Sequence, residues 1–162
     1  MTPLQTIQQH FEARLIETHD FRGDETVVIA GGLLTEMALF LKKTPELDFN
    51  YLMDLTAVDY LFFAGGRIEK RARFEVVYHF FSLKHNHRLR LKVPVEEQNP
   101  EIDSLTGLWA SANWFEREVW DMFGIRFKGH PDLKRILMYE EFQGHALRKD
   151  YPFNKRQPLI GL

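Results

Sequence analysis

The chain has 162 residues, 44% of them hydrophobic and 14% aromatic, which fits one globular domain and excludes a wholly disordered chain. It has no cysteine, which excludes disulfides, thiolate nucleophiles and Cys-ligated zinc, and argues against an iron–sulfur cluster in this chain. The net charge is only −2, but residues 1–60 hold 10 acidic and 4 basic residues, whereas residues 126–162 hold 4 acidic and 8 basic. Such an asymmetry is typical of a contact surface at the basic end.

Segments that would enter or cross a membrane are not expected. No apolar run approaches the ~18–20 residues of a spanning helix. The N-terminal stretch "MTPLQTIQQHFEARL" lacks the basic and apolar regions of a signal peptide. We therefore expect a protein that is soluble by itself.

The N-terminal third predicts two helices around a short strand. One apolar stripe predicts an amphipathic helix over residues 3–17: Leu4, Ile7, Phe11 and Leu15. A turn over residues 21–24 precedes the strand "ETVVIA" at 25–30. A second helix, which ends near Thr44 and Pro45, is predicted from a second stripe: Leu34, Met37, Ala38 and Leu41.

The middle of the chain predicts strands. Residues 51–63 form the first of these, and Gly65 and Gly66 turn the chain. "RFEVVYHFFSL" and "RLRLKVPV" flank a four-residue loop, residues 84–87, and predict a hairpin. In its second strand, Leu and Val alternate with Arg and Lys, so one face is expected in the core. Pro94 favours an edge position for this strand.

"WFEREVWDMFGIRF" at 114–127 is predicted to contain a helix. Asn113 is a good N-cap, Glu116 stands where a capping box places its acid, and Gly124 suits the C-terminal end. Arg117 and Asp121 lie together at i and i+4. The opposite side is apolar and is expected to hold the helix on the sheet: Phe115, Val119, Met122 and Phe123.

Beyond Gly129 the sequence has no sustained period of 2 or 3.6. Such a long irregular stretch is unusual inside a compact domain and predicts an arm that lies over a surface. The predicted architecture is therefore α+β and two-layered, with helices on one side of a mixed or antiparallel sheet. We divide it into a domain at 1–128 and a partner-docking arm at 129–162.

The residue patterns give little indication of a catalytic or metal-binding site. Glu116 and Glu118 point about 200° apart on a helix and cannot share one small substrate, which argues against acid–base catalysis. Five histidines invite a metal site, but no metal-binding spacing is present: His79, His85, His87, His130 and His145.

Nucleotide-binding and nucleophile motifs are likewise not found. The Gly-Gly pairs match neither phosphate-loop pattern, and no serine stands in a nucleophile-elbow context. The basic, aromatic tail could bind nucleic acid, but Arg, Tyr, Phe and Trp are also enriched where proteins meet. The economical interpretation is a scaffold or assembly subunit.

A spaced motif resembles the signature of one family. It consists of Glu116-Arg117-Glu118, Asp121-Met122-Phe123, His130, Lys134 and Ile136-Leu137. "LMDLTAVDY" at 52–60 and "GHALRKDYP" at 144–152 agree with it. The chain is thereby identified as similar, from about residue 25 to 155, to the C subunit of NADH-quinone oxidoreductase, a hydrophilic subunit of respiratory complex I. Ala146 departs from the family's usual proline, which puts the stiffness of the arm in doubt.

The resemblance implies a structural subunit of the peripheral arm of a proton-translocating NADH:quinone oxidoreductase. It implies no independent activity and no cofactor in this chain, with FMN and Fe-S clusters held by partner subunits. The expected partners are the quinone-pocket subunit, called the D subunit, and neighbouring Fe-S subunits. The expected location is the cytoplasmic face of the bacterial inner membrane, with only indirect membrane contact and no nucleic acid.

The matching motif positions receive structural or interface roles and no catalytic, cofactor or metal role: Glu116, Arg117, Glu118, Asp121, His130, Lys134, Arg148, Lys149 and Asp150. The charges beside the apolar stripe are expected to meet the early arm or a neighbouring subunit. The arm itself is expected to be mobile alone and ordered in the complex. A related membrane-bound hydrogenase or formate hydrogenlyase remains the alternative assembly.

Overall fold

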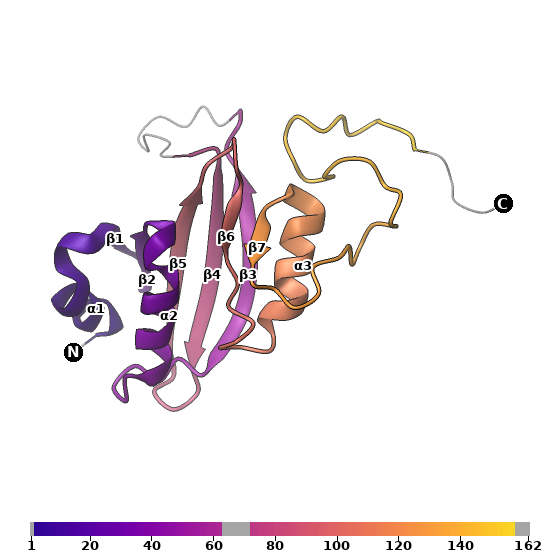
Figure 1. Ribbon diagram of the computed structural model, residues 1–162. Coiled ribbons are helices and arrows are strands. Elements are labelled where there is room, and N and C mark those ends of the chain that lie inside the picture. Colours follow the sequence, from indigo (N-terminus) through magenta and orange to yellow (C-terminus); the bar gives the residue numbers. More distant parts are fainter. Residues whose placement is uncertain (1, 63–71, 158–162) are drawn as a thin grey trace.

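The computed structural model describes residues 2–62 and 72–157, in which a five-stranded mixed sheet forms the centre of the molecule (Figure 1). The strand order is β1-β2-β5-β4-β3; β2 and β5 run parallel, and all other neighbours are antiparallel. The strands are β1 (Leu15–Phe21), β2 (Asp24–Ile29), β3 (Tyr51–Asp59), β4 (Phe74–Ser82) and β5 (His87–Val95).

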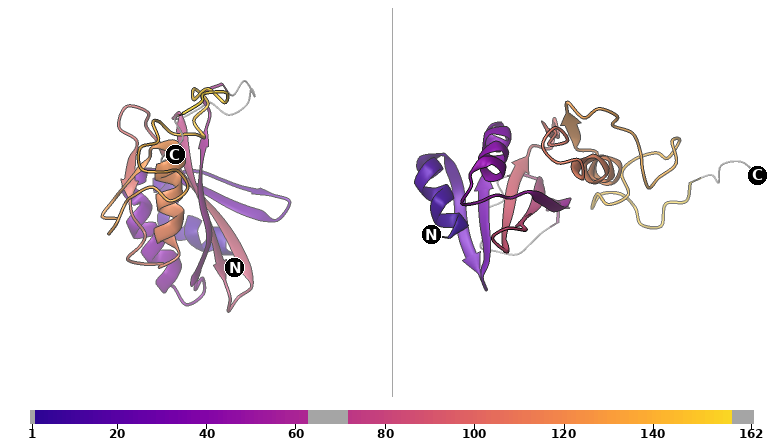
Figure 2. Two further views of the ribbon diagram at one scale, coloured as in Figure 1. Left: turned by 90° about the vertical axis from the view of Figure 1, so that its right-hand side faces the viewer. Right: turned by 90° about the horizontal axis from the view of Figure 1, so that it is seen from below.

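The α-helices of the described chain pack on the same side of this sheet (Figure 2). Ile7, Met37 and Val119, one from each helix, belong to a single hydrophobic core with the inward side chains of the strands. The helices are α1 (Pro3–Phe11), α2 (Leu34–Lys43) and α3 (Ala112–Phe123), with 3-10 turns at Glu12–Arg14 and Gly31–Leu33. This arrangement confirms the predicted α+β class.

A small parallel pair of strands lies beside α3. It consists of β6 (Glu101–Asp103) and β7 (Arg126–Lys128), which immediately precedes the arm. Residues 129–157 after it contain neither helix nor strand, as predicted for an irregular arm (Figure 1). The division into a domain at 1–128 and an arm at 129–162 stays a prediction.

The first helix is shorter than predicted. α1 ends at Phe11, and Leu15 instead begins β1, where it pairs with Ile29. Glu12 has a φ of 23°, a positive value at which the regular helix ends. The apolar stripe could not reveal this, because Leu15 packs against the core equally well from a strand.

The next elements agree with the sequence. β2 and α2 fall where they were predicted, and a turn at Arg22 and Gly23 joins β1 to β2. β3 begins at Tyr51 but ends at Asp59, earlier than the predicted residue 63. Residue 63 and the predicted turn at Gly65 and Gly66 lie outside the described residues.

The predicted hairpin is confirmed, but not its edge position. β4 and β5 pair continuously from Phe74 opposite Val95 to Ser82 opposite His87, and β5 lies between β2 and β4. Pro94 is tolerated there because the pairing of β5 with β2 ends earlier along the strand, at Lys92. The proline therefore has a strand neighbour on one side only, which is locally what an edge strand provides.

Tyr78 supplies a test of this core. Its side chain is fully buried, and its hydroxyl has no hydrogen-bond partner in the described part of the chain. An unsatisfied buried polar group costs about 1–3 kcal/mol. We expect Tyr78→Phe to raise the free energy of unfolding in urea by about 1 kcal/mol. Tyr60→Phe is the matched control, and it should lower this free energy because the Tyr60 hydroxyl donates to Glu75 Oε1 at 2.9 Å. A destabilised Tyr78→Phe variant would contradict the expectation.

Candidate functional site: the clamp between helix α3 and the arm

Helix α3 begins without the predicted cap. Its N-cap position is Ser111, whose side chain makes no capping hydrogen bond, and Asn113 lies inside the helix. The Asn113 carbonyl instead accepts a hydrogen bond from the His130 ring, 3.0 Å away at Nε2. The C-terminal end was predicted correctly: Gly124 is left-handed, with a φ of 75°, and its N–H donates to the Trp120 carbonyl.

Glu116 does not form the predicted capping box. It is fully buried, and its carboxyl accepts hydrogen bonds from the Leu105 N–H at 2.7 Å and the Ser104 hydroxyl at 2.6 Å. No cation of the described chain lies within ion-pair distance of it. Burial raises the pKa of Glu116 to about 7, although the bonds from Ser104 and Leu105 oppose the increase. Glu116 therefore ties α3 to the segment after β6.

Asp121 is the centre of the contact between α3 and the arm. Its buried carboxylate accepts three successive backbone N–H groups at Oδ2, from Ile136 at 3.1 Å and from Leu137 and Met138 at 2.9 Å each. Burial alone would raise the pKa of Asp121, but these bonds and Arg135 lower it below its ordinary value. The ionised carboxylate thus fixes the path of the arm.

Arg135 connects this carboxylate to a later part of the arm. Its Nη1 lies 2.5 Å from Asp121 Oδ1, and its Nη2 donates to the carbonyls of Phe142 and Gly144 at 2.8 and 3.2 Å. The predicted pair of Asp121 with Arg117 is therefore wrong. Arg117 donates instead to the carbonyls of Lys134 and Arg135, at 3.1 and 2.9 Å, so both arginines bind arm backbone.

The closing segment, residues 144–150, caps the C-terminal end of α3. The His145 ring Nδ1 donates to the Asp121 carbonyl at 3.0 Å, and the Leu147 N–H donates to the Met122 carbonyl at 3.0 Å. Arg148 Nε donates to the Phe123 carbonyl at 2.5 Å. Carbonyl groups in the last turn of a helix have no partner within the helix. Here the arm supplies those partners.

Gly124 is required by this close approach. A Cβ atom at this position would lie 2.5 Å from His145 Nε2 and 2.6 Å from Arg148 Nη2, and its φ of 75° also favours glycine. We call the contacts of α3 with residues 130–148 the clamp.

A second anchor holds the arm to the sheet. The buried Asp59, at the end of β3, accepts two hydrogen bonds from Arg73 and one from the Lys149 N–H at 2.9 Å. Arg73 also pairs with Asp150 at 2.8 Å and with Glu97 at 2.6 Å. Burial opposes ionisation of Asp59, but the bonds from Arg73, Lys149 and Leu61 lower its pKa overall. Lys149 therefore acts through its backbone and Asp150 through its carboxylate.

The remaining motif residues lie at the surface. Glu118 is exposed on α3, so Glu116 and Glu118 do not form a carboxylate pair. Lys134 pairs with Asp132 at 2.8 Å, and both side chains are 60% exposed. Such exposed pairs contribute at most about 1 kcal/mol. Within residues 2–62 and 72–157, no three His, Cys, Asp or Glu side chains gather as a metal site would require.

Three residues of these anchors were not singled out in the sequence: Asp59, Arg73 and Arg135. Asp59 lies within "LMDLTAVDY", the stretch that carries part of the resemblance. Arg135 lies between two motif positions in "LKRIL". Arg73 had no local signal, because each of its carboxylate partners lies in a distant part of the chain.

Comparisons with known proteins agree with the motif. A family model described as the 30 Kd subunit of respiratory-chain NADH dehydrogenase matches residues 27–157. The NADH-quinone oxidoreductase C subunit of Roseiflexus sp. (strain RS-1) is 46% identical over 156 residues, covering 96% of this chain and 86% of the relative. The C subunit of Geotalea uraniireducens (strain Rf4) is 43% identical over 157 residues, covering 96% and 90%.

Solved structures share the fold. A trypsin-resistant fragment (1-134) of Nqo5 superposes with a TM-score of 0.71 at 34% identity, covering 82% of this chain and 100% of the fragment. A chain of the membrane-bound sulfane sulfur reductase, an archaeal respiratory membrane complex, gives a TM-score of 0.70 at 18% identity, covering 93% and 85%. At that identity the second likeness shows the fold alone.

The fold and the clamp define an α+β protein whose buried acids hold its own backbone in place. The chain belongs to the 30 Kd subunit family of respiratory-chain NADH dehydrogenase, which confirms the resemblance found in the sequence. It is thus a subunit of an NADH-quinone oxidoreductase, and its partners are other subunits of complex I. None of its described helices is long and apolar enough to cross a membrane.

Asp121→Asn tests the clamp. The carboxylate accepts hydrogen bonds at both oxygens, whereas the amide has one oxygen and an N–H₂ group that faces other donors. Arg135 would also lose its counter-ion. We expect the free energy of unfolding in urea to fall by about 3 kcal/mol. Glu118→Gln, the same kind of change at an exposed position of α3, should alter it by less than about 0.5 kcal/mol. Equal effects of the two substitutions would contradict the role of Asp121.

Glu116→Gln tests the buried acid. With a pKa of about 7 in the folded protein against an ordinary 4.5, the folded state binds this proton more tightly than the unfolded state does. The stabilisation that this provides is therefore complete below about pH 4.5 and is lost as the pH rises through 7. Glutamine does not ionise, so the variant does not lose this stabilisation. Relative to the native protein, its free energy of unfolding should therefore rise by about 2 kcal/mol between pH 5 and pH 8. Urea unfolding of both proteins at the two pH values measures the difference, and a pH-independent difference would exclude a raised pKa.

Proposed function

We propose that this chain is a structural subunit of the peripheral arm of a proton-translocating NADH:quinone oxidoreductase. It supports electron transfer from NADH to quinone by holding other subunits in place, and it has no independent activity. FMN and Fe-S clusters are bound by those other subunits. The absence of cysteine from the sequence supports this, since thiolates are the usual ligands of such clusters.

The clamp is the observation that carries the proposal. Each buried acid of the motif is used to fix backbone: Asp121 binds the arm, and Glu116 binds the segment after β6. A catalytic carboxylate would need access to a substrate, and both side chains have no exposed surface. A structural role therefore accounts for the two buried acids of the motif.

The arm is the proposed docking segment for partners. Its ordered path presents large apolar side chains to solvent: Leu137 is 57% exposed, Leu147 is 52% exposed and Phe153 is 99% exposed. Exposed apolar surface of this kind marks protein interaction sites, and aromatic side chains are enriched in interfaces. We assign this surface to the quinone-pocket D subunit and the neighbouring Fe-S subunits.

The sequence led us to expect the whole arm to be mobile in the isolated chain, but the contacts with Asp121 and Asp59 hold residues 136–149 without a partner. We therefore propose ordering on binding chiefly for residues 151–157, beyond the second anchor.

The location follows from the partners. We place the chain at the cytoplasmic face of the bacterial inner membrane, attached through other subunits. The basic C-terminal segment, residues 126–162, is where that attachment is expected. A related membrane-bound hydrogenase or formate hydrogenlyase is distinguished by its own subunits in the experiment below.

Purification of the tagged chain in mild detergent, with identification of every co-purifying protein, tests the assignment. We expect the NADH-binding flavoprotein, Fe-S subunits and the D subunit. Arg148→Ala and Arg117→Ala should lower the yield of full-size complex on native gels, because each removes a clamp contact, while flavin on the other chains is retained. Lys84→Ala, at the exposed tip of the β4–β5 hairpin, is the control and should assemble normally. Recovery of hydrogenase subunits would support the alternative, and recovery of the chain alone would refute both.

A further inference from the structure

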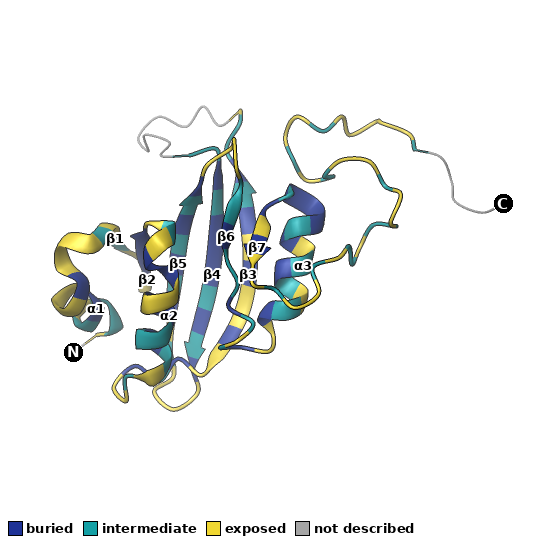
Figure 3. Cartoon of the chain, viewed as in Figure 1, coloured by how far each residue is buried: buried dark blue, intermediate teal, exposed yellow. Residues whose placement is uncertain are grey.

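No described helix covers the face of the sheet opposite α1, α2 and α3. The end of β3 near the β4–β5 hairpin is coloured as exposed in Figure 3. Two large side chains of this end of β3 are open to solvent: Tyr51 is 47% exposed and Met53 is 38% exposed. Farther along the same face, Val77 is buried, and Lys92 and Glu75 form an ion pair at 3.0 Å. Exposure of apolar side chains is thus concentrated at one end of the face.

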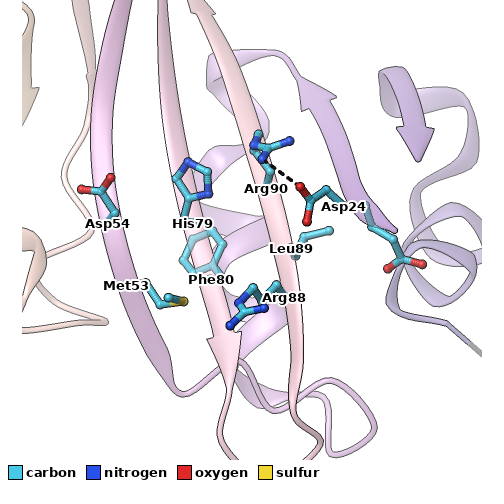
Figure 4. Close-up of a pocket in the computed structure, with 9 residues that line it drawn as sticks. Asp24, Met53, Asp54, His79, Phe80, Arg88, Leu89 and Arg90 are labelled. Carbon is cyan, nitrogen blue, oxygen red and sulfur yellow. Dashed lines mark ion pairs between the residues drawn. The ribbon is translucent and has the colours of Figure 1, made fainter. Parts of the chain in front are cut away.

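The strand register groups the side chains of this end. Tyr51 lies opposite Phe81, which lies opposite Arg88, and so an aromatic row crosses from β3 to β5. The next row contains Asp54, opposite His79, opposite Arg90. The register places the two rows next to each other, and Figure 4 shows Arg88 of the first row beside Asp54, His79 and Arg90 of the second.

The second row, together with Arg88 of the first, borders a hollow of about 310 Å³. It is lined from β2, β3, β4 and β5 by Asp24, Met53, Asp54, His79, Arg88 and Arg90, among others. Carboxylates and arginines line the hollow together with the apolar Met53, Phe80 and Leu89, and such a recess fits a protruding side chain of another protein. The hollow is therefore a recess in this surface rather than a separate site.

Some of the charged side chains around the hollow have an ion-pair partner and others have none among the described residues. Arg90 is paired with Asp24 at 3.6 Å and donates to the Thr26 hydroxyl at 3.2 Å. Arg88 has no carboxylate within ion-pair distance among the described residues, and it lies over the Phe81 ring, 5.5 Å from its centroid. Asp54, on β3, likewise has no cation within ion-pair distance in residues 2–62 and 72–157.

We propose that this patch, made of Tyr51, Met53, Asp54, Phe81 and Arg88, is a second docking surface that binds a different subunit of the same complex. The inference rests on the proposed function, because that function supplies the neighbours. The occupant presents an apolar side chain between a carboxylate that faces Arg88 and a cation that faces Asp54. This bipolar pattern satisfies both unbalanced charges and covers the aromatic row, and complementary charges of this kind fix the register of an interface.

The patch lies away from the clamp. The clamp and the second anchor are built from α3, the arm and the far end of β3, whereas the patch occupies the opposite face beside the β4–β5 hairpin (Figures 1 and 4). A chain with both surfaces contacts neighbours on two sides.

Photocrosslinking in the assembled complex tests this surface. Tyr51 is replaced by p-benzoylphenylalanine, an aromatic residue of similar placement, in the tagged full-length chain, and the purified complex is irradiated. We expect an adduct with a different subunit of the complex. Arg88→Glu in the same chain should lower the adduct yield about tenfold through charge repulsion. Lys84→Glu, the same charge reversal at the hairpin tip, should leave the yield unchanged.

The outcomes separate the two proposals. If the native chain co-purifies with the NADH-oxidising subunits but gives no adduct, the docking surface is refuted and the proposed function stands. An adduct with a second copy of this chain also refutes it, as does an adduct whose yield is the same in Arg88→Glu. A native chain that recovers no partner subunits refutes the proposed function itself.

Discussion

The carboxylate of Asp121 is the constraint on which the C-terminal third of the molecule depends. One buried oxygen receives three consecutive backbone N–H groups, and the other receives Arg135, which in turn binds two later carbonyls. An irregular segment has no ladder or helix to satisfy its backbone, so it needs partners from elsewhere. A single ionised side chain supplies several of them here.

The dependence is mutual. The arm takes its path from α3, and it returns donors to the carbonyls at the C-terminal end of α3 through His145, Leu147 and Arg148. The buried acids differ in whether they have a cationic partner. Asp59 and Asp121 each pair with an arginine, whereas Glu116 has only neutral donors among the described residues. Asp59 and Asp121 hold the arm, and Glu116 holds α3 to the segment after β6. A structural role explains all three without invoking a substrate.

Much of the fold could be predicted from the sequence, because alternating and helical apolar patterns are local. β2, α2 and the β4–β5 hairpin have such patterns. Leu15 was misassigned because a strand satisfies the same spacing, and Pro94 because it lies beyond the last residue that pairs with β2. In the candidate site, the sequence correctly predicted that the charges of α3 meet the early arm, where Arg117 and Asp121 bind backbone groups. The capping box of Glu116 and the pairing of Arg117 with Asp121 were wrong. Their true partners lie in the loop after β6 and in the aperiodic arm, and only the folded path brings them together.

This chain holds its own arm in place before any neighbour is present. Hydrogen exchange at the amides of Ile136, Leu137 and Met138 in the isolated protein measures this most directly. The account predicts exchange about a hundredfold slower than in an unstructured peptide of the same sequence, because these N–H groups are bound to Asp121. Exchange at the unstructured rate would show that the clamp does not form in the chain alone.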